Sequence, residues 1–224
     1  MTRHRWMKAE WPFPVRLLAK RIKQHSFVDE GQTGFIVDRV RDEYLEARYV
    51  ERYEFDETVS DPFGKELTFK RLEFRQTAFR ASPDWPGLEL IDPARSVQTL
   101  VNELLQATEF SLSVTPMAVD VMRWAEAFQD LADTKVVISS AQIGALVLED
   151  GVQAKVVMKG DKDVRGAYKV LARGKKHVLE KLQFRITQGS ASALILLANN
   201  ATAKVDGRDL SEDVLALIRR ALPH

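Results

Sequence analysis

A short turn separates two long stretches of this chain, and in each stretch apolar and charged residues alternate. The turn is Asp61-Pro62-Phe63-Gly64, with proline second and glycine fourth, an arrangement typical of a reverse turn. Residues 44–55 before it and 67–79 after it combine Tyr, Phe, Val and Leu with interleaved charges, as expected of strands with one solvated face. This pattern predicts a long antiparallel hairpin, with a bulge between Phe69 and Leu72, where the apolar phase shifts.

The rest of the chain is predicted to add helices and shorter strands. Apolar spacing predicts helices that begin at Pro14, Pro93, Pro116, Val164 and a capping Ser211. Strands are expected at residues 35–37, 110–114, 136–138, 145–148, 154–158, 182–186, 194–197 and 203–205. The expected fold class is therefore α+β, an antiparallel N-terminal β-meander with a mixed α/β C-terminal lobe.

Residues 81–87, Ala-Ser-Pro-Asp-Trp-Pro-Gly, form the stretch that is most typical of a linker. We therefore expect an N-terminal helix plus antiparallel meander over residues 1–82 and a mixed α/β lobe over residues 83–224. The two lobes could also form one continuous domain. A chain of 224 residues is long enough to bury an adequate core in either arrangement.

The composition excludes several classes of site and location. The chain has no cysteine, which rules out a disulfide framework, a thiolate zinc site, an iron–sulfur cluster and a cysteine nucleophile. No apolar run approaches the roughly 18 residues of a membrane helix, and the first residues do not resemble a signal peptide. We therefore expect a cytoplasmic protein that makes no contact with a membrane.

Familiar catalytic and cofactor motifs are absent from the sequence. It contains neither the glycine motifs of nucleotide-binding loops nor Gly-x-Ser-x-Gly. The four histidines are scattered singly, so no two have the spacing of ligands on one helix. Asp161 and Asp163 resemble the start of a calcium loop, but Arg165 stands where an oxygen ligand belongs. The sequence therefore predicts no catalytic residue, no metal site and no cofactor.

The predicted hairpin of residues 145–159, followed by the helix that begins at Val164, resembles the core of the PD-(D/E)xK nucleases. In that family, an aspartate on the first strand and an acid two residues before a lysine on the second hold magnesium for phosphodiester hydrolysis. Lys159 matches this lysine, but Val157 stands where the acid belongs. Three interpretations remain: a coincidental match, an inactive relative that binds nucleic acid, or a divergent nuclease. The candidate metal ligands of such a nuclease are Glu149, Asp150, Asp161 and Asp163.

Charges are segregated along the chain although the formal net charge is only +1. Residues 1–24 carry seven Lys or Arg and one Glu, and residues 159–176 carry seven Lys or Arg and two Asp. Between them, residues 28–61 carry eleven Asp or Glu and four Arg. Such patches, rather than the total charge, determine the local potential and the partners that a surface attracts.

Helical spacing places most of the basic residues in rows. A row of cations at intervals of three or four residues suits contact with phosphates, although Lys and Arg also fill ordinary solvated helix faces. The scarcity of acids in these two segments favours the first interpretation. The predicted nucleic-acid-binding residues are Lys162, Arg165, Lys169, Arg173 and Lys176 on one helix, Arg16, Lys20 and Lys23 on another, and Arg3 and Arg5.

The sequence thus favours a non-catalytic accessory or adaptor subunit. Its basic helical faces would bind DNA or RNA, and acidic residues 28–61 would bind a protein partner or another copy of the chain. Two alternatives remain open: a divergent metal-dependent nuclease, and a structural assembly protein that binds no nucleic acid.

Overall fold

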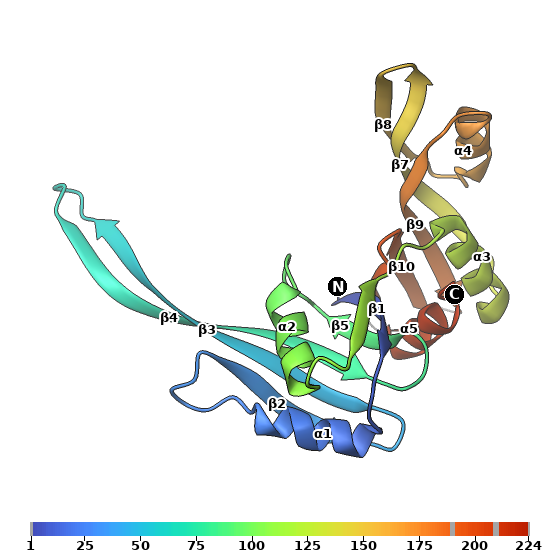
Figure 1. The fold of residues 1–224 in the computed structure, drawn as a ribbon. Helices are drawn as coiled ribbons and strands as arrows, with labels where there is room; N and C mark the ends of the chain where they lie inside the picture. The colour runs from blue at the N-terminus through green and yellow to red at the C-terminus, as the bar shows by residue number, and fades with distance from the viewer. Residues whose placement is uncertain (1, 189–190, 208–210, 224) are drawn as a thin grey trace. The chain divides into compact units, whose positions relative to one another are not determined.

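The structure is a computed structural model that describes residues 2–188, 191–207 and 211–223. Within these residues it contains five helices and eleven strands with antiparallel pairing, which confirms an α+β fold with a large antiparallel sheet (Figure 1). The chain forms two compact units: unit 1 is Met1–Trp6 with Pro116–His224, and unit 2 is Met7–Thr115. The expected linker, residues 81–87, lies inside unit 2.

Unit 2 is built on a five-stranded sheet with the order β2-β3-β4-β5-β1. Its core contains the packed rings of Phe35, Tyr49 and Phe79, and helix α1 buries Leu18 and Ile22 in the same cluster. The elements of this unit are β1 (Thr2–Glu10), α1 (Val15–Gln24), β2 (Thr33–Val40), β3 (Leu45–Ser60), β4 (Glu66–Ala81), β5 (Gly87–Ile91), α2 (Gln98–Ala107) and β6 (Ser113–Pro116), which pairs with β1.

The predicted hairpin is present and longer than the sequence pattern indicated. β3 and β4 pair without interruption from Leu45 opposite Ala81 to Ser60 opposite Glu66, so the expected bulge between Phe69 and Leu72 is wrong. Both faces of the hairpin are exposed in this region, so no core requires the apolar residues to share one side. Phe69 and Leu72 therefore lie on opposite faces of a regular strand.

Unit 1 contains a second set of strands, in the order β1-β11-β10-β9-β7-β8, in which the first residues of β1 pair with β11. Trp6 and Trp124 make an edge-on ring contact within its core, and Trp124 Nε1 donates a hydrogen bond to the carbonyl oxygen of Ile218 at 2.9 Å. The other elements are α3 (Val121–Ala132), β7 (Val137–Glu149), β8 (Val152–Lys159), α4 (Arg165–Ala172), β9 (Val178–Gln188), β10 (Ala191–Ala198), β11 (Thr202–Asp206) and α5 (Ser211–Arg220).

Some predicted boundaries need correction. Helix α3 begins at Val121 rather than at Pro116, because the Asp120 carboxylate accepts hydrogen bonds from the first free N–H groups of the helix. Helix α2 likewise begins at Gln98, well after Pro93. Strand β1 was not predicted. The side chain of Ser211, the expected cap of α5, lies outside the described residues.

Other local predictions are confirmed. The predicted helices that begin at Pro14 and Val164 are present as α1 and α4, and the predicted strands 145–148 and 154–158 belong to the β7–β8 hairpin, which turns at Gly151. Among the helices that the structure describes, none combines the length and the apolar character needed to cross a membrane.

Gly87 provides a test of the packing in unit 2. Its φ of +98° is left-handed, and a Cβ at this position would overlap the backbone carbonyl of Ala9, whereas Gly64 has a φ of +83° with open space around it. Gly64→Ala should cost about 1 kcal/mol through backbone strain alone. Gly87→Ala should cost several kcal/mol, roughly 3 or more, because β1 and β5 must also separate. Urea unfolding followed by circular dichroism measures both losses, and equal losses would contradict this packing.

Candidate functional site

Strand β9 has one buried face and one polar face. Leu182, Phe184 and Ile186 are buried in the unit 1 core, against which α3 packs. Because side chains alternate along a strand, the residues between them point the other way. These are Lys181, Gln183, Arg185 and Thr187, of which all but Gln183 are exposed. The polar face of β9 is therefore directed away from the helices.

The neighbouring strands add cations to the same face. Leu196 of β10 lies opposite both Gln183 and Lys204, so Lys204 shares the face of Gln183. Arg3 lies opposite Lys204, and Arg5 is two residues further along β1. Three strand spacings separate β9 from β1, a width of about 14 Å. The basic face, as the term is used below, consists of Arg3, Arg5, Lys181, Arg185 and Lys204.

Few acids oppose these cations. Asp206 shares the face, since it lies opposite Leu194 of β10, which in turn lies opposite Arg185. Within the described part of the chain, neither Arg185 nor Lys204 forms an ion pair. Arg5 Nε is buried without a hydrogen-bond partner among the described residues. Arg185 and Lys204 therefore retain their positive charge on this face.

Beyond β9, one of the cations of β8 is paired. Lys155 of β8 forms an ion pair with Glu180 at 2.9 Å, and the side-chain amide of Gln142 donates to the same carboxylate. These two contacts hold the pKa of Glu180 below its ordinary value, and the contact with Lys155 has the larger effect. Lys155 is therefore neutralised locally, whereas Lys159 of the same strand lies opposite Ser140, and hence on the face of Gln183, with no ion pair among the described residues.

A cavity of about 580 Å³ adjoins the basic face at Arg185. It is lined by two cations, three hydroxyl groups and one carboxylate, those of Lys135, Arg185, Thr134, Ser139, Thr187 and Asp161. The cations and hydroxyls suit an anionic group, and the carboxylate can accept a hydrogen bond from a ligand hydroxyl. The cavity thus has the chemistry of a phosphate and sugar site.

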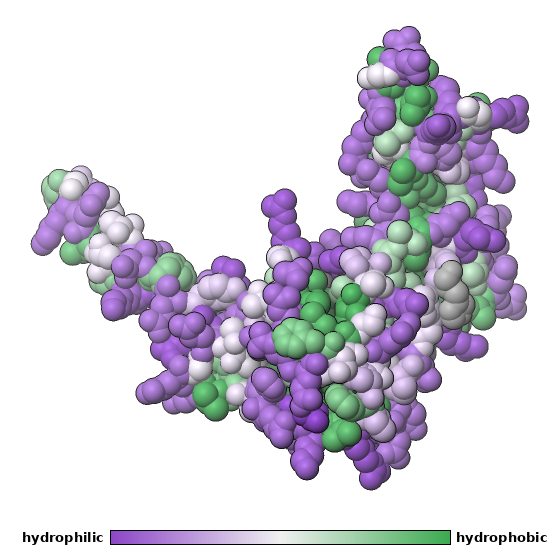
Figure 2. Space-filling model, in the orientation of Figure 1, coloured by the Kyte–Doolittle hydropathy of each residue, from purple (hydrophilic) through white to green (hydrophobic). Residues whose placement is uncertain are grey.

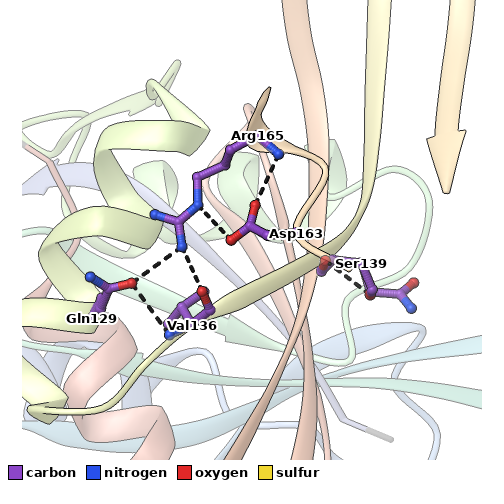
Figure 3. Close-up of polar contacts among 6 residues, drawn as sticks. Gln129, Val136, Ser139, Asp163 and Arg165 are labelled. Atoms are coloured by element: carbon purple, nitrogen blue, oxygen red, sulfur yellow. Dashed lines mark hydrogen bonds and ion pairs between the residues drawn. The ribbon is translucent and has the colours of Figure 1, made fainter. Parts of the chain in front are cut away.

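Arg165, one of the predicted phosphate ligands, is used within the protein instead (Figure 3). Its Nε donates to Asp163 at 2.9 Å, and its Nη2 donates to the carbonyl oxygen of Val136 at 2.5 Å and to Gln129 at 3.3 Å. The guanidinium therefore joins the start of α4 to α3 and to the residue before β7. Its side chain is mostly buried, so its charge is directed into the protein.

The predicted row of cations around α4 is only partly helical. Lys162 precedes the helix, Lys169 lies in its last turn, and Arg173 is the residue at which it ends. Lys176 follows Gly174, whose φ of +69° turns the chain away from the helix axis. The structure thus places these cations in one short region of unit 1 without aligning all five on one helix face.

The other predicted cations lie in separate places. Arg3 and Arg5 belong to the basic face of unit 1, whereas α1 lies in unit 2. On α1, Lys20 and Lys23 are exposed, but Arg16 forms an ion pair with Asp42 at 2.8 Å. Helix α1 therefore offers two cations instead of three.

The candidate nuclease ligands are not brought together. Glu149 and Asp150 lie at the turn of the β7–β8 hairpin, whereas Asp161 and Asp163 follow the other end of β8. Eight extended residues separate the two pairs, a length of about 26 Å. Within residues 2–188, 191–207 and 211–223, no three His, Asp or Glu side chains are grouped to hold a metal ion.

Arginines offset much of the negative charge of residues 28–61. Asp38 pairs with Arg48 inside the segment, while Asp42 pairs with Arg16 of α1. Glu46 pairs with Arg80 of β4, and Glu57 pairs with Arg71 of the same strand. The acidic segment is therefore part of a mixed-charge surface in the folded unit.

Comparisons with known proteins leave the function open, since no family model matches the chain and no curated protein matches its sequence. The site residues that were not predicted are Lys135, Lys181, Arg185 and Lys204. The alternation of polar and apolar residues over 181–187 could have revealed two of them, because it has the period of a strand with one buried face.

Arg165 is bonded inside the protein and Lys169 is exposed, so substitutions at these two residues should change the free energy of unfolding by different amounts. Arg165→Gln should lower the free energy of unfolding by about 1–3 kcal/mol, because Asp163 and the Val136 carbonyl lose a charged partner. Lys169→Gln, on the exposed side of the helix, should change it by less than about 0.5 kcal/mol. Urea unfolding of the two variants checks the difference. Equal stability of both would show that the Arg165 contacts contribute nothing.

Proposed function

We propose that this protein is a non-catalytic accessory or adaptor subunit that binds nucleic acid through the basic face of unit 1. The observation that carries the proposal is the set of Lys and Arg side chains on β1, β11 and β9, directed away from the helices, with Leu194 and Leu196 of the intervening β10 on the same face. Cations on one face of a sheet can meet phosphates, and each neutralised phosphate releases counterions that favour binding.

The chemistry of the surface favours contact with the backbone over reading of bases. The described Trp and Phe side chains of unit 1, Trp6, Trp124, Phe128 and Phe184, are all buried in its core. Its one Tyr, Tyr168, is hydrogen-bonded to His177. Binding without a stacking platform depends on phosphates and is tolerant of sequence.

The cations near α4 extend the proposed surface. Lys162 follows Asp161 of the cavity directly, so Lys162 and Lys169 can contact a strand that leaves the basic face there. Arg165 is removed from the proposed contacts because its charge is engaged inside unit 1. A nuclease activity is not proposed, since the candidate acids lie at opposite ends of β8.

Charge reversal on the basic face tests the proposal. The double variant Lys181→Glu/Arg185→Glu should weaken binding by at least about tenfold and reduce the log–log salt slope by about 2, because two phosphate contacts become repulsive. Fluorescence polarisation with labelled single- and double-stranded DNA and RNA, between about 50 and 200 mM salt, measures both quantities.

A matched control separates position from net charge. Arg123→Glu/Arg220→Glu changes the net charge by the same amount on exposed positions of α3 and α5, which cover the other side of the sheet. It should reduce affinity by less than about threefold. Equal losses in the two variants, or no binding by the unchanged protein at about 50 mM salt, would refute the proposed surface.

A further inference from the structure

The hairpin of unit 2 continues well beyond the strands that flank it (Figure 1). β2 pairs with β3 only as far as Glu51, and β5 pairs with β4 only from Ala78 onwards. Residues 52–74 are defined here as the arm. Over most of its length the arm has no second layer, and Phe27 touches it only near its base, at Phe74. The arm therefore exposes both of its faces.

The arm exposes several large apolar side chains to solvent. Figure 2 shows apolar side chains among polar ones along it. Its exposed large apolar residues are Phe55, Val59, Phe63, Leu67, Phe69, Leu72 and Phe74, and Phe63 at the tip is 96% exposed. An isolated two-stranded hairpin is marginally stable in water, and apolar patches that a chain leaves uncovered mark sites of association.

The strand register divides these residues between two faces. Val59 lies opposite Leu67, Phe55 opposite Arg71, and Glu57 opposite Phe69, so all six share one side. This side, residues 55, 57, 59, 67, 69 and 71, is called the apolar face. The other side carries the pair Thr58 and Thr68 at the same level, which are joined through their hydroxyl groups. The outer half of the arm is therefore amphipathic.

The charges of the arm disfavour nucleic acid as its partner. Residues 52–74 contain six Asp or Glu and four Lys or Arg, so the arm is net negative. A negatively charged surface repels phosphates and anionic lipids. On the apolar face itself, the charged residues are Glu57 on β3 and Arg71 on β4. The face therefore carries one charge of each sign, on different strands.

We propose that two copies of this chain form a homodimer by packing the apolar faces of their arms together, about a two-fold axis parallel to the arms. Such an axis exchanges left and right but keeps the level along the arm, so β3 of each copy lies over β4 of the other. Glu57 of each copy then lies over the strand that carries Arg71 of the other, and Val59 lies level with Leu67 across the interface. An axis perpendicular to the arms would lay the two strands that carry Glu57 over each other instead.

The available area suits this partner. A half-exposed Phe presents roughly 100 Å² of apolar surface, so the apolar face and Phe63 together offer on the order of 500 Å² per copy. A standard stable interface buries about 800 Å² per partner, so a face of this size suits a weak dimer whose population rises with protein concentration.

Sedimentation over a range of concentrations tests the proposal. The unchanged protein should shift from monomer to dimer as its concentration rises. Val59→Lys/Phe69→Lys should raise the dimer dissociation constant at least about tenfold, because four cations would be brought into the dimer interface. Thr58→Lys/Thr68→Lys adds the same charges at the same level on the opposite face and should leave the constant within about threefold.

Either of two results would overturn the proposal. A protein that stays monomeric at the highest soluble concentration has no self-association, and the arm then has a different partner. A dimer that the two double variants weaken equally does not use the apolar face. Both variants change only exposed residues, so circular dichroism should show the same folded spectrum for each.

Cross-linking tests the direction of the axis. Because the chain has no cysteine, Lys65→Cys at the tip of the arm introduces a unique thiol. Parallel arms bring the two tips together, so a short bismaleimide should link Lys65→Cys into a covalent dimer. Asp150→Cys, at the equally exposed turn of the β7–β8 hairpin, should give no such product. A dimer whose arm tips do not cross-link would overturn the proposed axis.

The dimer does not rest on the proposed nucleic-acid binding. The apolar face belongs to unit 2 and the basic face to unit 1. Sedimentation without nucleic acid therefore reports on the arm alone, and a single result cannot refute both proposals.

Discussion

The burial of one face of β9 is the interaction on which the candidate site depends. Leu182, Phe184 and Ile186 pack into the core of unit 1, and the pleat then directs Lys181 and Arg185 to the opposite side. A register slip of one residue would bury the cations and expose the apolar side chains, so the hydrophobic core fixes the position of the charges. The basic face is therefore positioned by the same free energy that stabilises unit 1, and it needs no dedicated loop.

In unit 2, a hydrophobic core covers only part of the sheet. The rings of Phe35, Tyr49 and Phe79 fill a core only where β2 and β5 flank the central hairpin. Beyond that point β3 and β4 satisfy each other's hydrogen bonds but bury no side chains. The arm thus keeps the apolar residues of a strand without the layer that would cover them, and the proposed dimer would supply that layer.

The sequence predicted local features better than tertiary ones. The turn at residues 61–64, the long hairpin and the inward face of α1 follow from local chemistry and periodicity, and all are present. Strand β1 was missed because its buried residues change parity between Trp6 and Met7, which breaks the alternation of a strand. The role of Arg165 could not be predicted, since its partners lie on α3 and before β7. The cations of β9, which alternate with apolar residues as in a strand, were not predicted because the sequence analysis considered only cations at helical spacing.

Salt should weaken one of the two proposed surfaces much more than the other, and this difference connects them to an adaptor role. Phosphate contacts on the basic face weaken steeply as salt rises, because counterion release loses its advantage. Association through the arm is mainly apolar and only its flanking charges are screened, so it should persist under the same conditions. A dimer would then carry two basic faces whose joint binding exceeds that of either one. Nucleic acid would dissociate first while the protein assembly remains intact, as expected of a subunit that holds its partner constitutively and binds nucleic acid reversibly.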